Sequence, residues 1–155
     1  MSKSTKIILG VVASLSAIVA TLAVLNFREM AERLDEHIEG SFRIVSGDDS
    51  RHISTDDLEG LSPMEISAAE RGNLRNFRGL PLAKILEFSG LDHREAARLH
   101  FISMDGFRTN ISMAEIGNAY IVFEEDGEKM PFMLVLPEDP FPNRWARYIL
   151  EMILE

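Results

Sequence analysis

The longest apolar stretch of the chain covers residues 7–27, which contain no charged side chain and lie directly between Lys6 and Arg28. Backbone amides and carbonyls inside a bilayer must form their hydrogen bonds within the segment. An apolar run of this length therefore predicts a helix that crosses the membrane. We predict a transmembrane anchor over residues 7–27.

The charges that flank this stretch predict its orientation. Lys3 and Lys6 precede it, together with the amino terminus, and no acidic residue does. Positive flanks stay in the cytoplasm, so we expect residues 1–6 to be a cytoplasmic tail and the C-terminal part to lie outside, in the periplasm of a bacterium. A cleaved secretory signal is the alternative, because Thr21 and Ala23 offer small residues to a signal peptidase. The stretch exceeds the usual signal core of roughly 7–15 residues, which favours an uncleaved anchor.

Helical spacing of apolar residues continues beyond the anchor and predicts a juxtamembrane amphipathic helix over residues 28–40. Gly40 is suited to end this helix. The apolar stripe consists of Phe27, Met30, Ala31, Leu34 and Ile38. This stripe can pack on the following domain or pair with another chain. Two heptads alone make a weak coiled coil, which favours packing.

From residue 41 onward, the pattern changes to short alternating runs that predict β-strands. The predicted strands cover residues 42–45, 51–53, 64–68, 99–104, 107–111, 120–123, 131–136 and 147–154. Cap and proline signals predict short helices after Ser54, at Pro81, after Asp92 and after Ser112. Residues 69–78 lack periodicity and are predicted to form an ordered loop. The pattern predicts an α+β fold, with one β-rich domain over residues 41–155 and short helices between its strands.

Charge and composition exclude several classes of function. The whole chain has a net charge of −9; the residues after the anchor have 14 basic and 25 acidic side chains and thus a net charge of −11. Such a surface repels phosphate backbones, which argues against nucleic-acid binding. The chain has no cysteine, so it can form neither a disulfide nor a metal–thiolate bond. The four histidines are scattered without metal-ligand spacing, and no hydrolase or nucleotide-binding motif is present.

Five motifs resemble, in their order, the oxidoreductase molybdopterin-binding domain, the fold of sulfite oxidase. They lie at residues 54–59, 77–82, 104–107, 111–116 and 132–137, and the resemblance covers nearly all of residues 42–154. In catalytic members of that family, a cysteine thiolate binds molybdenum just ahead of a Gly-x-Pro-Leu motif, which here is residues 79–82. The resemblance places Glu70 near the position of that cysteine. A carboxylate is a poor substitute for a soft thiolate, so molybdenum chemistry is in doubt.

The resemblance also implies where a pterin cofactor would bind. Residues 72–75 are similar to the family's Gly-Asn-x-Arg motif, and Arg108 follows a second motif at residues 104–107. Asn73, Arg75 and Arg108 are therefore the candidate cofactor-binding residues. Further arginines that can converge on this place are Arg71, Arg78, Arg144 and Arg147. Arginines at such spacing are more often solvated partners of nearby acids such as Glu70. We expect no bound metal and no cofactor, with molybdopterin as the alternative.

Three hypotheses for function follow. The leading one is a membrane-anchored, outward-facing, molybdopterin-binding-like domain that acts as a non-catalytic binding or protein-interaction module, with another envelope protein as partner. The alternative is a molybdopterin-dependent oxidoreductase, or a subunit of one, that retains the pterin cofactor. In the third hypothesis, the domain senses a small ligand and transmits the signal through the helix that joins it to the membrane.

Overall fold

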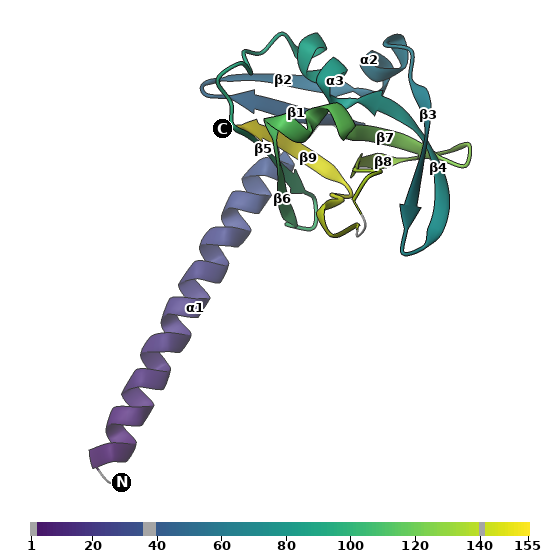
Figure 1. Ribbon diagram of the computed structural model, residues 1–155. Helices are drawn as coiled ribbons and strands as arrows, with labels where there is room; N and C mark the ends of the chain where they lie inside the picture. Colours follow the sequence, from purple (N-terminus) through teal and green to yellow (C-terminus); the bar gives the residue numbers. More distant parts are fainter. Residues whose placement is uncertain (1–2, 36–39, 140–141) are drawn as a thin grey trace. The chain divides into compact units, whose positions relative to one another are not determined.

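The computed structural model describes residues 3–35, 40–139 and 142–155. The chain forms two units, residues 1–36 and 37–155, and each is described by itself. The first unit is one helix, α1 (Lys3–Asp35) (Figure 1). Within it, Val11–Arg28 is long and apolar enough to cross a membrane, and none of this segment is buried. The predicted helix end at Gly40 falls just beyond residues 36–39, which lie outside the described residues.

The second unit contains two β-sheets (Figure 1). The first has the strand order β2-β1-β9-β5-β6, and the second has the order β3-β4-β7-β8. Strands β1 and β9 run parallel, whereas the other described neighbours are antiparallel. The strands are β1 (Ser41–Ser46), β2 (Asp49–Ser54), β3 (Met64–Glu70), β4 (Asn73–Pro81), β5 (Arg98–Ser103), β6 (Arg108–Ser112), β7 (Tyr120–Glu125), β8 (Glu128–Val135) and β9 (Ile149–Leu154).

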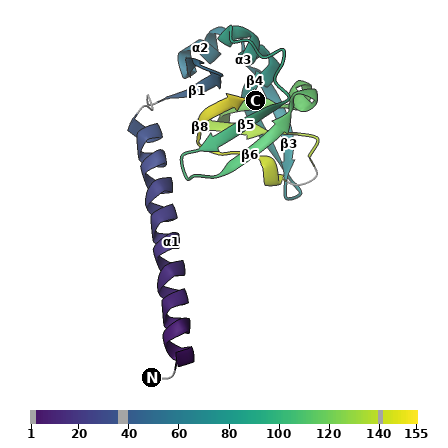
Figure 2. The same cartoon turned by 90° about the vertical axis from the view of Figure 1, so that its left-hand side faces the viewer.

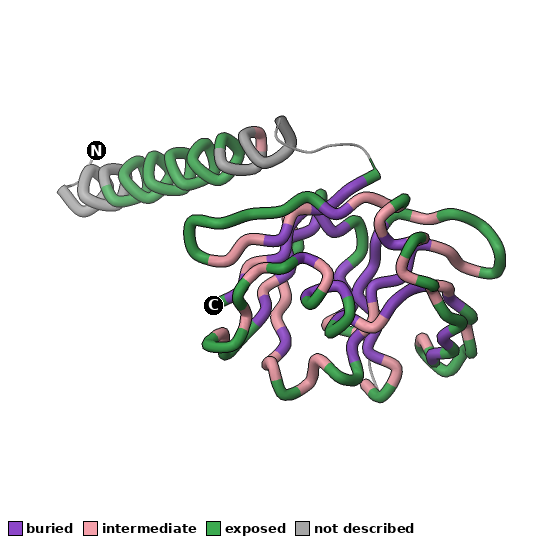
Figure 3. Tube along the Cα trace, turned by 90° about the horizontal axis from the view of Figure 1, so that it is seen from above, coloured by how far each residue is buried: buried purple, intermediate pink, exposed green. Residues whose placement is uncertain are grey.

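The hydrophobic core lies between these two sheets. Phe42 on β1 meets Phe132 on β8 edge to face, with ring centroids 4.9 Å apart. Phe77 on β4 contacts the buried Trp145 in the same manner at 6.1 Å. Figure 3 shows buried positions along most of the strands and exposed positions mainly at their connections. Each fully buried phenylalanine contributes roughly 1.5–3 kcal/mol to folding, so these aromatic contacts are a main source of stability.

Short helices occur between the strands. Three of them lie at predicted places: α2 (Thr55–Gly60), α3 (Leu82–Ser89) and the 3-10 helix η1 (Met113–Asn118). A further 3-10 helix, η2 (Pro142–Arg144), was not predicted. The predicted cap of α2 is confirmed, because the Asp57 N–H donates to the Ser54 hydroxyl at 3.2 Å and the Ser54 N–H donates to the Asp57 carboxylate at 2.9 Å. The Ser54 hydroxyl also donates to the Asp57 carboxylate at 2.7 Å, and this bond, followed by the one from the Ser54 N–H, lowers the pKa of Asp57.

Gly79 shows why the Gly-x-Pro-Leu motif needs a glycine at its first position. The register between β4 and β7 shifts between Arg78 and Gly79, which brings the two backbones close together. A Cβ atom on Gly79 would lie 2.3 Å from the Ile121 carbonyl oxygen. This oxygen belongs to the backbone of a central strand, so a side chain at position 79 requires the strands to separate.

Two predictions about local structure were wrong. Residues 69–78 are not a loop: β3 and β4 form a continuous hairpin, with Arg71 and Gly72 at its turn (Figure 1). Its outer face carries mostly polar side chains and its tip is exposed on both faces, so the sequence lacks the alternation expected of a strand. The short helix predicted after Asp92 is also absent. The Asp92 carboxylate instead accepts a hydrogen bond from the Arg94 N–H at 3.1 Å, which closes a local turn.

Candidate functional site

The tip of the β3–β4 hairpin forms one wall of an open pocket of about 420 Å³. Its lining residues are Glu70, Arg71, Asn73, Arg75 and Arg147. Two of the three predicted cofactor-binding residues, Asn73 and Arg75, are therefore brought together here. The third, Arg108, begins β6 in the other sheet. Arg71 occupies the hairpin turn with a φ of 51°, and its side chain is exposed.

Arg75 is held between two carboxylates. Its Nη2 donates to Glu125 Oε2 at 2.5 Å, and its Nη1 donates to Glu70. The guanidinium also lies over the Phe77 ring, 5.5 Å from the centroid. The hydrogen bonds that Arg75 donates to Glu125, followed by the one to Glu70, raise the pKa of Arg75, although partial burial opposes this. The donors of Arg75 are thus largely engaged by acids of the same domain.

Glu70 joins this cluster to the residues that precede β9. Its second carboxylate oxygen accepts a hydrogen bond from Arg147 Nη2 at 2.8 Å. Burial acts to raise the pKa of Glu70, but the hydrogen bond from Arg75 and the charge of Arg147 outweigh it and lower the pKa. Glu70 therefore remains ionised and neutralises part of the positive charge of the pocket.

The other predicted arginines form similar ion pairs elsewhere in the domain. Arg78 contacts Glu59 at 2.6 Å and Glu124 at 3.1 Å, which ties α2 to β7. Arg144 contacts Asp139 and Glu115, each at 2.7 Å. The interpretation of these arginines as partners of nearby acids therefore holds for Arg75, Arg78, Arg144 and Arg147.

Sequence reasoning missed Glu125 as the main partner of Arg75. The two residues are fifty positions apart, and Glu125 meets Phe77 across the β4–β7 ladder. Only the register between these strands brings them together.

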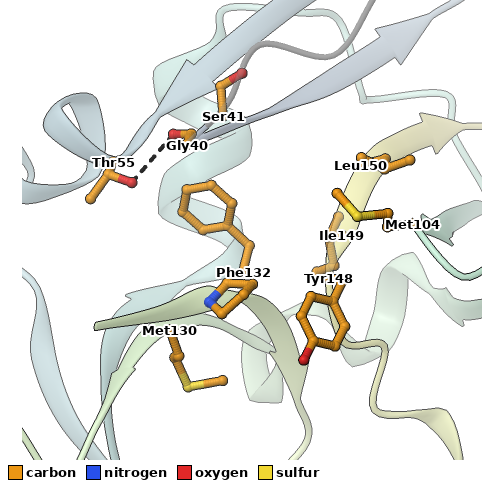
Figure 4. Close-up of a pocket in the computed structure, with 10 residues that line it drawn as sticks. Gly40, Ser41, Thr55, Met104, Met130, Phe132, Tyr148, Ile149 and Leu150 are labelled. Carbon is orange, nitrogen blue, oxygen red and sulfur yellow. Dashed lines mark hydrogen bonds between the residues drawn. The ribbon is translucent and has the colours of Figure 1, made fainter. Parts of the chain in front are cut away.

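A second, apolar cavity of about 320 Å³ was not indicated by the sequence (Figure 4). It is lined by Gly40, Ser41, Thr55, Met104, Met130, Pro131, Phe132, Tyr148, Ile149 and Leu150. Tyr148 has a φ of 55°, which is rare for a bulky residue. Its carbonyl accepts a hydrogen bond from the Met104 N–H at 2.9 Å, which helps to hold this conformation.

The donor set does not fit the metal centre that the resemblance implies. The chain has no cysteine to supply the thiolate. Across residues 3–35, 40–139 and 142–155, the histidines and acids form no group of three that can hold a metal ion. The hairpin pocket is more suited to a small anion, because its three arginines outnumber Glu70 and its neighbour Glu125.

No protein-family model matches the chain, and no curated protein matches it either. Among solved structures, the chain is similar to the sulfane dehydrogenase SoxCD from Paracoccus pantotrophus, with a TM-score of 0.63 and 16% sequence identity over 74% of this chain. The domain has the sulfite-oxidase type of fold. This confirms the predicted α+β class and shows that the domain shares its fold with that enzyme. The match covers 37% of the SoxCD chain, and at this identity the likeness shows the fold alone.

Proposed function

We propose that this protein is a membrane-anchored, non-catalytic binding module that keeps the sulfite-oxidase type of fold and engages another envelope protein. The main support for the proposal is that the guanidinium of Arg75 is already bound by carboxylates of the same domain. This candidate cofactor ligand is bound by Glu125 and Glu70, and the chain offers no thiolate for a metal. A cofactor phosphate at this place would have to displace a carboxylate from the guanidinium or share it with one.

The hairpin tip supports the assignment of a protein partner. Leu74 is 72% exposed there, close in sequence to the exposed Arg71. An exposed leucine combined with arginine is a composition typical of contact surfaces, in which a few apolar and arginine side chains contribute most of the binding energy. In the proposed orientation, α1 crosses the membrane with its N-terminus in the cytoplasm, and the domain faces the outside.

Site-specific photo-cross-linking in living cells tests the proposal. A benzophenone amino acid replaces Leu74 in the full-length chain, and the matched control carries it at Ser50, which is exposed on β2. We expect a discrete protein adduct from position 74 that disappears with Arg71→Glu and does not form from position 50. Equal labelling from both positions, or none from position 74, would contradict the interaction module.

The alternative function is that of a molybdopterin-dependent oxidoreductase, or a subunit of one. The surplus of arginine in the hairpin pocket favours it, since Arg71, Asn73 and Arg147 offer donors for an anionic group. This alternative predicts that added molybdopterin raises the melting temperature of the full-length protein and that Arg71→Gln abolishes the shift. Our proposal predicts no shift in either protein.

A further inference from the structure

The apolar cavity beside Tyr148 has a lining unlike the rest of this acidic domain. Not one of its ten lining residues is charged. Most are aliphatic, aromatic or thioether side chains, and the polar groups are the hydroxyls of Ser41, Thr55 and Tyr148. The Thr55 hydroxyl already donates to the Gly40 carbonyl at 3.3 Å (Figure 4). Such a lining selects an uncharged, apolar ligand.

Exposed apolar side chains occur at the cavity wall and next to it in the fold. Met104, Phe107 and Tyr148 are each 40–50% exposed. Met104 and Phe107 belong to the β5–β6 hairpin (Figure 2), where the Ser103 N–H donates to the Phe107 carbonyl at 3.0 Å. The Met104 N–H donates to Tyr148, so the three residues lie at one corner of the domain. Clustered exposed apolar groups of this kind mark interaction sites.

The backbone of Tyr148 gives a second, independent indication. A tyrosine with a φ of 55° is conformationally strained, and strained residues cluster at ligand sites where the surrounding structure holds them. In this backbone conformation, the ring of Tyr148 lies on the cavity wall, and the residue is half exposed (Figure 4). A glycine or asparagine would adopt this backbone at lower cost, but neither would supply the aromatic wall.

We propose that this cavity binds the hydrocarbon chain of a membrane lipid. The inference rests on the proposed membrane anchoring, because Gly40 and Ser41 on the cavity wall are the first residues described after the apolar helix. Along the sequence, only residues 36–39 separate this wall from the end of α1. A volume of about 320 Å³ holds on the order of ten non-hydrogen atoms, enough for part of one acyl chain. The uncharged lining excludes the headgroup.

The test uses the full-length chain in lipid nanodiscs that contain a phosphatidylcholine with a diazirine at the end of one acyl chain. After irradiation, mass spectrometry maps the labelled peptides. We expect label in α1 and also around Met104, Met130 and Tyr148. Tyr148→Asp should reduce the label in the domain about tenfold, because a carboxylate opposes contact with hydrocarbon. Aspartate tolerates positive φ, so this variant keeps the fold.

Two control variants separate a specific effect at the cavity from a general effect of the added negative charge. Met64→Asp adds the same charge at an exposed apolar residue outside the cavity and should leave the labelling unchanged. Met104→Glu is a second cavity variant and should act like Tyr148→Asp. Label confined to α1 would overturn the cavity proposal while keeping the anchor, whereas no label in α1 would overturn both. Domain label that is insensitive to Tyr148→Asp, or cross-links between two copies of the chain, would also overturn it.

Discussion

Replacing Arg75 with glutamine tests whether this arginine holds the domain together. The variant removes the guanidinium that links Glu70 on β3 to Glu125 on β7 and leaves two carboxylates without their main partner. Hydrogen bonds between charged groups contribute roughly 1.5–3 kcal/mol each when protected from water. The three side chains are 18–28% exposed, which reduces the contribution to about 1 kcal/mol for each carboxylate. We expect Arg75→Gln to lower the free energy of unfolding by about 2 kcal/mol.

Urea unfolding of the full-length chain in detergent micelles measures this loss. Trp145 is the only tryptophan of the chain and is buried against Phe77, so its fluorescence follows the β domain and is silent about α1. With an m-value of about 2 kcal/mol/M, the midpoint should fall by about 1 M. The matched control is Arg71→Gln, an exposed arginine of the same hairpin, which should change the free energy of unfolding by less than about 0.5 kcal/mol.

A double-mutant cycle assigns the loss to the ion pair. If Arg75 acts through Glu125, then Arg75→Gln and Glu125→Gln together should cost less than the sum of the two single changes, with a coupling of about 1 kcal/mol. The reasoning is refuted if Arg75→Gln unfolds at the same urea concentration as Arg71→Gln, or if the two changes are additive.

Three further predictions follow from single positions. Gly79→Ala should destabilise the domain by about 3 kcal/mol in the same urea assay, because its Cβ would meet the Ile121 carbonyl oxygen; a loss below about 1 kcal/mol would contradict the close strand approach. The backbone hydrogen bond from Ser112, followed by Arg144, lowers the pKa of Glu115 to about 2, so its stabilisation is complete above pH 4.5 and disappears as the pH falls toward 2. Because Glu115 is 40% exposed, we expect only about 1 kcal/mol, measured as the difference between wild type and Glu115→Gln across this pH range. Tyr148→Asn should raise the free energy of unfolding by about 1 kcal/mol through relief of the positive φ, and unchanged stability would argue against strain.

The features that the sequence predicted well are local ones. The apolar residues of α1 and the Ser54–Asp57 cap depend on residues that are close along the chain. The fold class followed from several such signals in the right order, and the likeness to SoxCD confirmed it. Predictions of this kind succeed because each signal stabilises its own element before any tertiary contact forms.

The features that the sequence did not predict depend on register between distant strands. Residues 69–78 of the β3–β4 hairpin were predicted to be a loop, whereas residues 64–68 were correctly predicted as a strand, because exposed Leu74 and its polar neighbours hide the alternation at the tip. The pairing of Arg75 with Glu125 requires the β4–β7 register, which includes an irregularity at Gly79. The apolar cavity collects residues from β1, β8 and the segment before β9, and its key element is the backbone conformation of Tyr148. Residue type alone contains no signal for that conformation.

The cofactor content of the full-length protein tests the central claim most directly. The protein is purified in detergent from a host that makes molybdopterin, and its molybdenum and extractable pterin are measured per mole of chain. We predict far less than one equivalent of either, because Arg75 is bound by Glu70 and Glu125 and the chain has no thiolate. One equivalent of pterin, lost on Arg75→Gln but retained in Arg78→Gln, would contradict the account and establish the hairpin pocket as a cofactor site.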